Sequence, residues 1–147
     1  MNLLTGEYRN TLDEKGRILL PSKLRSAISG NQLVVTQGFE RCLWLYLPSE
    51  WDNLSSKIME KSSLFSAGNR LVRRRFIAPA QEIEIDKAGR LSIPQSLRSF
   101  ASLSKDCVIL GINKYIEIWD SDSYEKYLNE NIDSLADATE ELNSIGF

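Results

Sequence analysis

Residues 12–25 read LDEKGRILLPSKLR, and residues 85–98 read IDKAGRLSIPQSLR. The two stretches align without a gap, and the positions identical in both are, in the first copy, Asp13, Gly16, Arg17, Pro21, Leu24 and Arg25. The register continues along the chain, since Gly38 corresponds to Gly111 and Trp51 to Tyr124, 73 positions later. Two copies of one unit predict a pseudo-symmetric molecule that presents the same hairpin twice.

Each copy has the pattern of a strand, a tight turn, a second strand, a short helix and a further hairpin. In the first copy, polar and apolar residues alternate over 8–13, and Gly16 permits the positive φ of a tight turn. Pro21 is suited to the first turn of a helix, and the apolar runs 33–36 and 42–47 flank Gly38. The sequence therefore predicts an α+β fold. Each repeat alone is close to the lower size limit for independent folding, so we expect both to share one core.

A further helical segment follows each repeat. Trp51, Leu54 and Ile58 share one face at helical spacing, and a short helix is predicted over 70–76. At the end of the chain, the spacing of the apolar residues predicts an amphipathic helix with an acidic outer face. We divide the chain into a first repeat at 7–50, a helical connector at 51–79, a second repeat at 80–123 and an acidic C-terminal helix at 124–147.

The composition of the 147 residues, 42% hydrophobic and 26% charged, is that of a soluble globular protein. No apolar run is long enough for a membrane span, and no signal peptide is visible, so we expect a cytoplasmic protein without a membrane partner. We interpret Cys42 and Cys107 as small buried thiols. The chain has no histidine, which excludes Ser-His and Cys-His nucleophiles and imidazole metal sites.

The charge is unevenly distributed along the chain. Residues 1–98 contain 15 Lys and Arg against 10 Asp and Glu, whereas residues 99–147 contain 3 against 10. Such an asymmetry is typical of a nucleic-acid-binding protein with an acidic tail, although an uneven solvated surface would also produce it.

The two turns of the repeated hairpin are the strongest functional signal. In one interpretation, Asp13 and Asp86 only cap the turns and pair with Arg17 and Arg90, but an exposed pair of this kind contributes roughly 0–1 kcal/mol. In the interpretation that we favour, each aspartate holds its arginine extended toward a guanine edge or a phosphate, from a β-ribbon in the major groove of DNA. The lysines that add positive charge beside these turns are Lys15 and Lys87.

Other cations in the repeats are candidates for phosphate contacts, which strengthen binding without reading sequence. They are Arg9, Lys23, Arg25 and Arg98. Arg25 and Arg98 recur in register, so they are also candidates for structural bonds between the repeats. The basic run 70–75 is interpreted as an interface that makes salt bridges between subunits rather than a surface that reads bases.

Two other classes of function remain open at this point. Glu82, Glu84 and Asp86 lie on one face of a predicted strand and could bind Mg²⁺ in a nuclease. Their counterparts are Arg9, Thr11 and Asp13, so this cluster is not duplicated, and we expect no metal, no cofactor and no catalytic activity. A module whose hairpins bind a partner protein is the other alternative.

These residues resemble the MraZ family of bacterial transcriptional regulators, whose units belong to the AbrB-like swapped-hairpin group. The resemblance is carried by residues 13–17 and 86–90, by Pro21 and Pro94, and by the connector ending in Arg75-Phe76. It implies two repeats that share one β-barrel-like core, and a ring-shaped homo-oligomer associated with the nucleoid. It also implies binding to direct repeats of double-stranded DNA upstream of the cell-division and cell-wall gene cluster, usually as a repressor. Arg17 and Arg90 would be the leading DNA contacts, oriented by Asp13 and Asp86, with Lys15 and Lys87 beside them.

Overall fold

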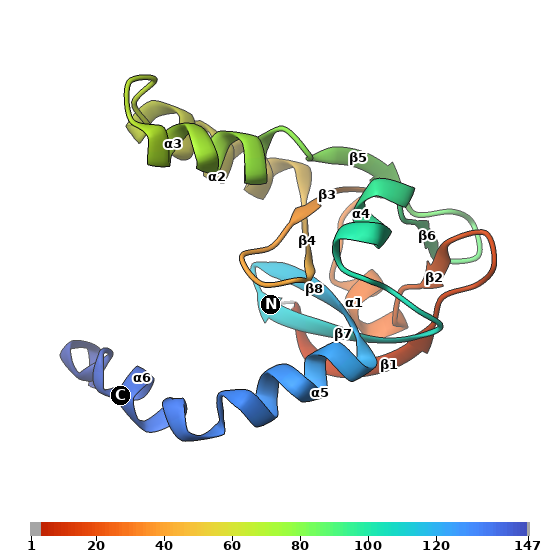
Figure 1. Cartoon of the computed structure of the whole chain (residues 1–147). Coiled ribbons are helices and arrows are strands. Elements are labelled where there is room, and N and C mark those ends of the chain that lie inside the picture. The colour runs from red at the N-terminus through yellow and green to blue at the C-terminus, as the bar shows by residue number, and fades with distance from the viewer. Residues whose placement is uncertain (1–3, 147) are drawn as a thin grey trace.

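The computed structural model describes residues 4–146 (Figure 1). The first repeat contains β1 (Leu4–Thr11), β2 (Arg17–Leu19), α1 (Ser22–Ser26), β3 (Gln32–Gln37) and β4 (Leu43–Tyr46). The connector contains α2 (Pro48–Lys61), α3 (Ala67–Val72) and the π-helical turn η1 (Arg73–Ile77). The second repeat contains β5 (Gln81–Glu84), β6 (Arg90–Ser92), α4 (Gln95–Phe100), β7 (Asp106–Asn113) and β8 (Tyr115–Asp120). The chain continues through α5 (Ser121–Glu130), η2 (Ile132–Ser134), α6 (Leu135–Glu140) and η3 (Asn143–Ile145).

The two repeats exchange strands rather than standing side by side. A six-stranded antiparallel sheet has the order β1-β7-β8-β4-β3-β5. Its outer pairs join β1 to β7 and β3 to β5, and its central pair joins β4 to β8, so three of its five ladders connect one repeat to the other. Each repeat is therefore incomplete without the other.

The first strands after the two turns form a separate ribbon. β2 and β6 pair antiparallel in a two-stranded sheet. Isolated bridges between Leu12 and Ile18 and between Ile85 and Leu91 connect this ribbon to the larger sheet. The two sheets surround one core, as the expected barrel-like fold requires, but the ladders among residues 4–146 do not close into a continuous barrel.

A pseudo-twofold axis relates the repeats. It passes through the two places where residues 73 positions apart face each other, namely Ile18 opposite Leu91 and Trp44 opposite Glu117. At the second of these places, the indole Nε1 of Trp44 donates a hydrogen bond to Glu117 Oε2 at 2.8 Å. Glu117 Oε1 also accepts a bond from Trp119 Nε1 at 3.0 Å.

The repeats share one large hydrophobic core, as expected from their size, and a smaller buried cluster contains Cys42, Val108, Leu110 and Trp119. Equivalent residues from both repeats meet in it, including Ile18 with Leu91 and, from the short helices, Leu24 with Leu97. Both cysteines are buried and unpaired, and burial raises the pKa of the Cys107 thiol to about 11. The prediction of small buried thiols is confirmed.

Two helical arms project from the side of the molecule opposite the ribbon (Figure 1). One is α2 with α3, anchored where Trp51 packs against Tyr46 and Phe76. The other begins with α5, whose Tyr124 and Tyr127 pack on the Trp119 ring. None of the helices within residues 4–146 is long and apolar enough to cross a membrane.

The C-terminal segment differs from the single amphipathic helix that the sequence predicts. The helix is interrupted at Asn131, after which η2, α6 and η3 follow as short pieces. Its apolar residues remain exposed, since Leu128, Ile132 and Leu135 retain 47, 71 and 66% of their accessible surface. An apolar stripe with no core to cover it provides little energy to keep a long helix continuous.

Candidate nucleic-acid interface

The first hairpin turn is built around the carboxylate of Asp13. Asp13 Oδ1 accepts hydrogen bonds from the backbone N–H groups of Lys15 at 2.9 Å and Arg17 at 2.8 Å. Its Oδ2 accepts a bond from Arg17 Nε at 2.8 Å. Because this contact uses Nε, the two terminal Nη groups of the guanidinium are left outside it.

The second turn repeats this geometry atom for atom. Asp86 Oδ1 accepts from the N–H groups of Ala88 at 2.9 Å and Arg90 at 2.8 Å, and Oδ2 accepts from Arg90 Nε at 3.0 Å. The glycine in each turn, Gly16 or Gly89, has a φ of 78° or 85°. The sequence correctly predicted both the turns and their aspartate–arginine pairs.

Hydrogen bonding stabilises the ionised form of both aspartates. The backbone N–H of Arg17 is the main cause that lowers the pKa of Asp13 below its usual value, and the backbone N–H of Arg90 does the same for Asp86. The side-chain contacts with the same arginines act in the same direction. Each turn thus holds an ion pair at the protein surface.

The ribbon presents both arginines on one face. Ile18 and Leu91 point into the core and are 1% and 0% exposed. Side chains alternate along a strand, so the neighbouring residues point outward. In the register of the ribbon, Arg17 lies opposite Ser92 and Leu19 lies opposite Arg90. The two arginines are therefore diagonal neighbours on adjacent antiparallel strands.

Leu19 and Ser92 complete this outward face, and the sequence interpretation did not include them. Leu19, the last residue of β2, is 48% exposed although it is a large apolar side chain. Its carbonyl accepts a bond from Asn10 Nδ2 at 2.6 Å. The signal that could have identified them was the strand alternation itself, because residues two positions beyond Arg17 and Arg90 share their face.

Lys15 and Lys87 are exposed at the turns, but they are not equivalent positions. In the repeat register, Lys15 corresponds to Ala88 and Lys87 to Glu14. Each turn therefore carries one lysine, placed differently along the loop.

Arg9 and Lys23 lie together beside the first repeat's half of the ribbon. Both line a surface hollow of about 540 Å³ whose wall also contains Leu19. Arg9 is already engaged with α5, because its Nη1 donates to Ser121 Oγ at 2.7 Å and its Nη2 lies 3.6 Å from Glu125 Oε1. The equivalent positions in the second repeat are Glu82 and Ser96, so the two flanks of the ribbon differ in charge.

Arg25 and Arg98 are placed differently from the other candidate cations. Each packs against the turn glycine of the opposite repeat, Arg25 against Gly89 and Arg98 against Gly16. The structure thus separates them from Arg9 and Lys23 and brings them to the bases of the two turns.

The remaining candidates do not assemble into a site. Among residues 4–146, no group of three His, Cys, Asp or Glu side chains could hold a metal ion. Glu84 instead accepts a bond from Asn31 Nδ2 at 2.8 Å, and Asp86 is held by Arg90.

The basic run 70–75 binds within its own chain. Arg73 donates to Ser62, and Arg75 donates to the Gly38 carbonyl at 2.7 Å and stacks on the Phe100 ring. These contacts fasten the connector to both repeats.

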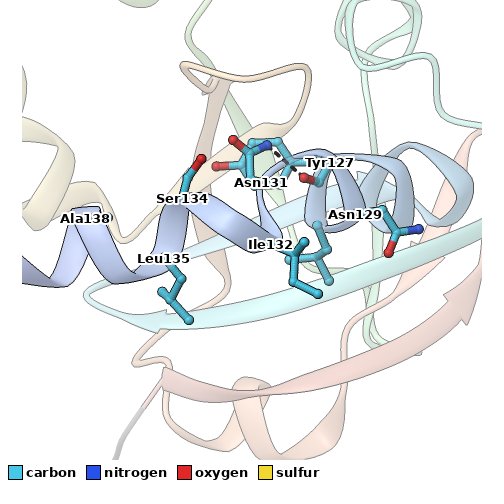
Figure 2. Close-up of a pocket in the computed structure, with 8 residues that line it drawn as sticks. Tyr127, Asn129, Asn131, Ile132, Ser134, Leu135 and Ala138 are labelled. Atoms are coloured by element: carbon cyan, nitrogen blue, oxygen red, sulfur yellow. Dashed lines mark hydrogen bonds between the residues drawn. The ribbon is translucent and has the colours of Figure 1, made fainter.

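A largely apolar hollow lies at the C-terminal arm, far from the ribbon. It measures about 450 Å³ and is lined by residues of α5, η2 and α6. Figure 2 shows Ile132 and Leu135 pointing to one side of the chain, whereas Asn131 and Ser134 point to the other. It contains no charged group, which favours an interface rather than a reactive site.

Comparison with known proteins agrees with the repeat. A family model described as "MraZ protein, putative antitoxin-like" matches the chain twice, over residues 3–75 and 76–144. Each match includes one repeat and the helices that follow it.

Curated relatives cover the whole chain. "Transcriptional regulator MraZ" of Treponema denticola is 55% identical over 98% of this chain and 100% of its own length. The proteins of the same name in Treponema pallidum and Ligilactobacillus salivarius are 49% and 40% identical, over 98% and 95% of this chain and 97% and 96% of their own lengths. The solution structure of PHS018 from Pyrococcus horikoshii matches with a TM-score of 0.33. It is 15% identical in sequence, and the match covers 80% of this chain and 89% of that chain, so the similarity is distant. The chain belongs to the MraZ family, whose curated members are named transcriptional regulators.

Proposed function

We propose that the chain is a sequence-specific DNA-binding transcriptional regulator, without catalytic activity, that reads DNA with the outward face of the β2–β6 ribbon. The observation that carries this proposal is the pair Arg17 and Arg90, which lie diagonally on adjacent strands, each held by an aspartate through Nε. An arginine restrained in this way loses less side-chain entropy when it binds, and its Nη groups can make bidentate contact with a guanine edge.

The shape of the ribbon suits the major groove. The major groove of B-DNA is roughly 12 Å wide and accepts a two-stranded antiparallel ribbon. The ribbon is short and lies at one end of the molecule, away from both helical arms (Figure 1). Lys15 and Lys87, exposed at the turns, would then lie near the phosphates on either side of the groove.

Arg9 and Lys23 would contact phosphates on the first repeat's side of the ribbon. Both line the hollow next to Leu19, which lies opposite Arg90, so they add two cations there beside one acidic residue, Glu7. Arg9 would have to share its guanidinium between Ser121, Glu125 and DNA, so Lys23 is the better candidate.

The proposal includes a homo-oligomeric ring that engages repeated operator sites. Both arms carry exposed apolar residues, such as Phe65 at 92% and Leu71 at 64% on one arm and Ile145 at 73% on the other. In the basic run 70–75, Arg74 is exposed, and the C-terminal arm contains the exposed Asp133, Asp137 and Glu140. Unlike, complementary surfaces favour head-to-tail contacts, which generate a ring when the rotation between subunits closes. A ring that binds several DNA repeats at once gains affinity from effective concentration.

The regulatory context of the proposal follows from the family resemblance. The target would be direct repeats upstream of the cell-division and cell-wall gene cluster, and the usual outcome would be repression. The protein would then act in the cytoplasm, at the nucleoid.

Fluorescence anisotropy with the DNA upstream of this protein's own gene tests the proposal. A scrambled duplex of equal length is the control, and both are measured over a series of salt concentrations. We expect a preference of roughly 10³-fold or more for the native sequence. Equal, weak, salt-sensitive binding to both duplexes would contradict sequence-specific recognition and would favour the protein-interaction module.

Variants then test the assigned residues. Arg17→Ala and Arg90→Ala should each weaken specific binding by about 1–3 kcal/mol, because each removes one base contact. Lys57→Ala is the matched control, since Lys57 is an exposed cation on α2, in the arm remote from the ribbon. An unchanged affinity in both arginine variants would exclude the ribbon as the reading surface.

A further inference from the structure

Each turn glycine is covered by an arginine of the opposite repeat. A Cβ built on Gly16 would collide with the guanidinium of Arg98, and a Cβ built on Gly89 would collide with that of Arg25. Two independent reasons therefore require glycine at these positions. The backbone has a positive φ, and a guanidinium occupies the place of a side chain. The exchange is reciprocal, so both turns are constructed in the same way.

Backbone hydrogen bonds fix the same contact. The N–H of Ile93 donates to the Gly16 carbonyl at 2.9 Å, and the N–H of Leu20 donates to the Gly89 carbonyl at 2.9 Å. Nη1 of Arg98 in turn donates to the carbonyl of Ile93, the residue whose N–H holds Gly16. Arg98, Ile93 and Gly16 thus form one connected set of contacts across the two repeats.

These contacts argue against phosphate binding by Arg98. A phosphate contact needs a guanidinium that can turn toward solvent, whereas that of Arg98 is part-buried and bonded to the carbonyl of Ile93, which is 1% exposed. Arg25 is more exposed, but its guanidinium occupies the equivalent place on Gly89. The recurrence of both residues in register follows from this shared geometry.

We propose that Arg98 and Arg25 are positioning residues that act across the repeats. Arg98 holds the turn that carries Asp13 and Arg17, and Arg25 holds the turn that carries Asp86 and Arg90. The proposal rests on the proposed role of the turns in DNA binding and adds a coupling to it. Each reading arginine is held in place by the repeat to which it does not belong.

The chemistry requires arginine at these positions. A planar guanidinium can pack against a glycine backbone, and in Arg98 one Nη also bonds a carbonyl, whereas a lysine ammonium is a compact, strongly hydrated charge without a plane. The substitution Arg→Lys therefore keeps the charge and removes the positioning. It separates the proposed role from a purely electrostatic one.

The first test uses NMR of the arginine Nε–H groups, without DNA. In Arg98→Lys, we expect the Nε–H signal of Arg17 to shift or broaden, because its turn loses support, while that of Arg90 is unchanged. In Arg25→Lys, the effect should cross over, with Arg90 affected and Arg17 unchanged. Unchanged signals in both variants, or changes confined to the variant's own repeat, would overturn the proposal.

Two variants are used so that the proposal can still be tested if one of them fails to fold. The backbone amide spectrum of each variant reports whether the shared core is intact. If Arg98→Lys does not fold, the exposed Arg25 still provides the decisive measurement, because only Arg90 should respond to it.

The second test measures DNA binding against salt concentration. Arg98→Lys should reduce the preference for the native over the scrambled duplex by about tenfold or more, the equivalent of one base contact, with the salt dependence unchanged. Lys23→Ser is the control for a phosphate contact and should weaken binding to both duplexes equally. If Arg98→Lys binds like the wild type and Arg98→Ala lowers the salt slope by about 1, Arg98 is a phosphate contact and the proposal is wrong.

The two tests also separate this inference from the proposed function. A wild-type protein without sequence preference would contradict the proposed function. The crossed NMR effect would still show whether the turns are held across the repeats. A wild type with the expected preference but no crossed effect would contradict only the positioning role.

Discussion

The two hairpin turns have nearly the same internal geometry, but their surroundings differ. Asp13 with Arg17 and Asp86 with Arg90 make the same three hydrogen bonds, at distances that agree within 0.2 Å. The first repeat places Arg9, Leu19 and Lys23 at the end of the ribbon where Leu19 lies opposite Arg90. The equivalent positions of the second repeat are Glu82, Ser92 and Ser96, and Ser92 lies opposite Arg17. The duplicated part is the device that holds an arginine, and the divergent part is the surface around it. A surface of this kind can distinguish the two directions of a DNA site, whereas a strictly symmetric ribbon could not.

The largest expected effect tests whether the two repeats are equivalent in the core. Ile18→Ala and Leu91→Ala should each lower the free energy of unfolding by about 2–5 kcal/mol, because both side chains are almost fully buried at the pseudo-axis. Urea unfolding at a fixed protein concentration measures both. A large loss in one variant with less than about 1 kcal/mol in the other would break the equivalence of the repeats inside the molecule.

An intermediate effect on DNA affinity is expected when the residues at the equivalent positions 23 and 96 are exchanged. Lys23→Ser gives the first flank the residue found in the second, and it should lower the slope of log affinity against log salt by about 1 through loss of one phosphate contact. Ser96→Lys makes the converse change and should raise the slope if DNA passes that flank. Anisotropy titrations at several salt concentrations provide the slopes. If Lys23→Ser leaves the slope unchanged, DNA does not follow the first flank.

The smallest effect concerns pH and should be the same at both turns. The pKa of Asp13 and Asp86 is lower in the folded chain than the usual value, near 3.9. The contribution of these contacts to stability is therefore complete above that usual value and is lost only as the pH falls through the lower folded-state pKa. NMR titration of the two carboxyl carbons should show both midpoints below the usual value and no change between pH 5 and 8. A midpoint at or above the usual value for either aspartate would mean that its turn is not formed in solution.

The local features of the fold could be predicted from the sequence. The repeat, the turn glycines and the Asp–Arg pairs are encoded within a few residues, so pattern and turn chemistry identify them. The core that the two repeats share was predictable from the size of each repeat, because a unit of some 45 residues buries too little surface alone.

The partners of those features could not be predicted. The pairing of β1 with β7 and of β3 with β5 joins segments far apart in the chain, and alternation specifies a strand's faces but not its neighbour. The seating of Arg98 on Gly16 has the same cause, since it depends on how the repeats exchange strands. The interruption at Asn131 was missed because apolar spacing predicts a helix whether or not another surface covers it.

The contact between Trp44 and Glu117 bears on the ancestry of the chain. These residues are equivalent in the two repeats and face each other across the pseudo-axis, with the indole donating to the carboxylate. In a homodimer of half-length chains, the same position would meet its own copy, as Trp against Trp or Glu against Glu, and no such donor–acceptor pair could form. A chain that carries both halves in one polypeptide can hold different residues at the two copies of that position. The Trp–Glu pair is consistent with divergence of duplicated repeats, and it gives the central strands a contact that identical subunits could not make.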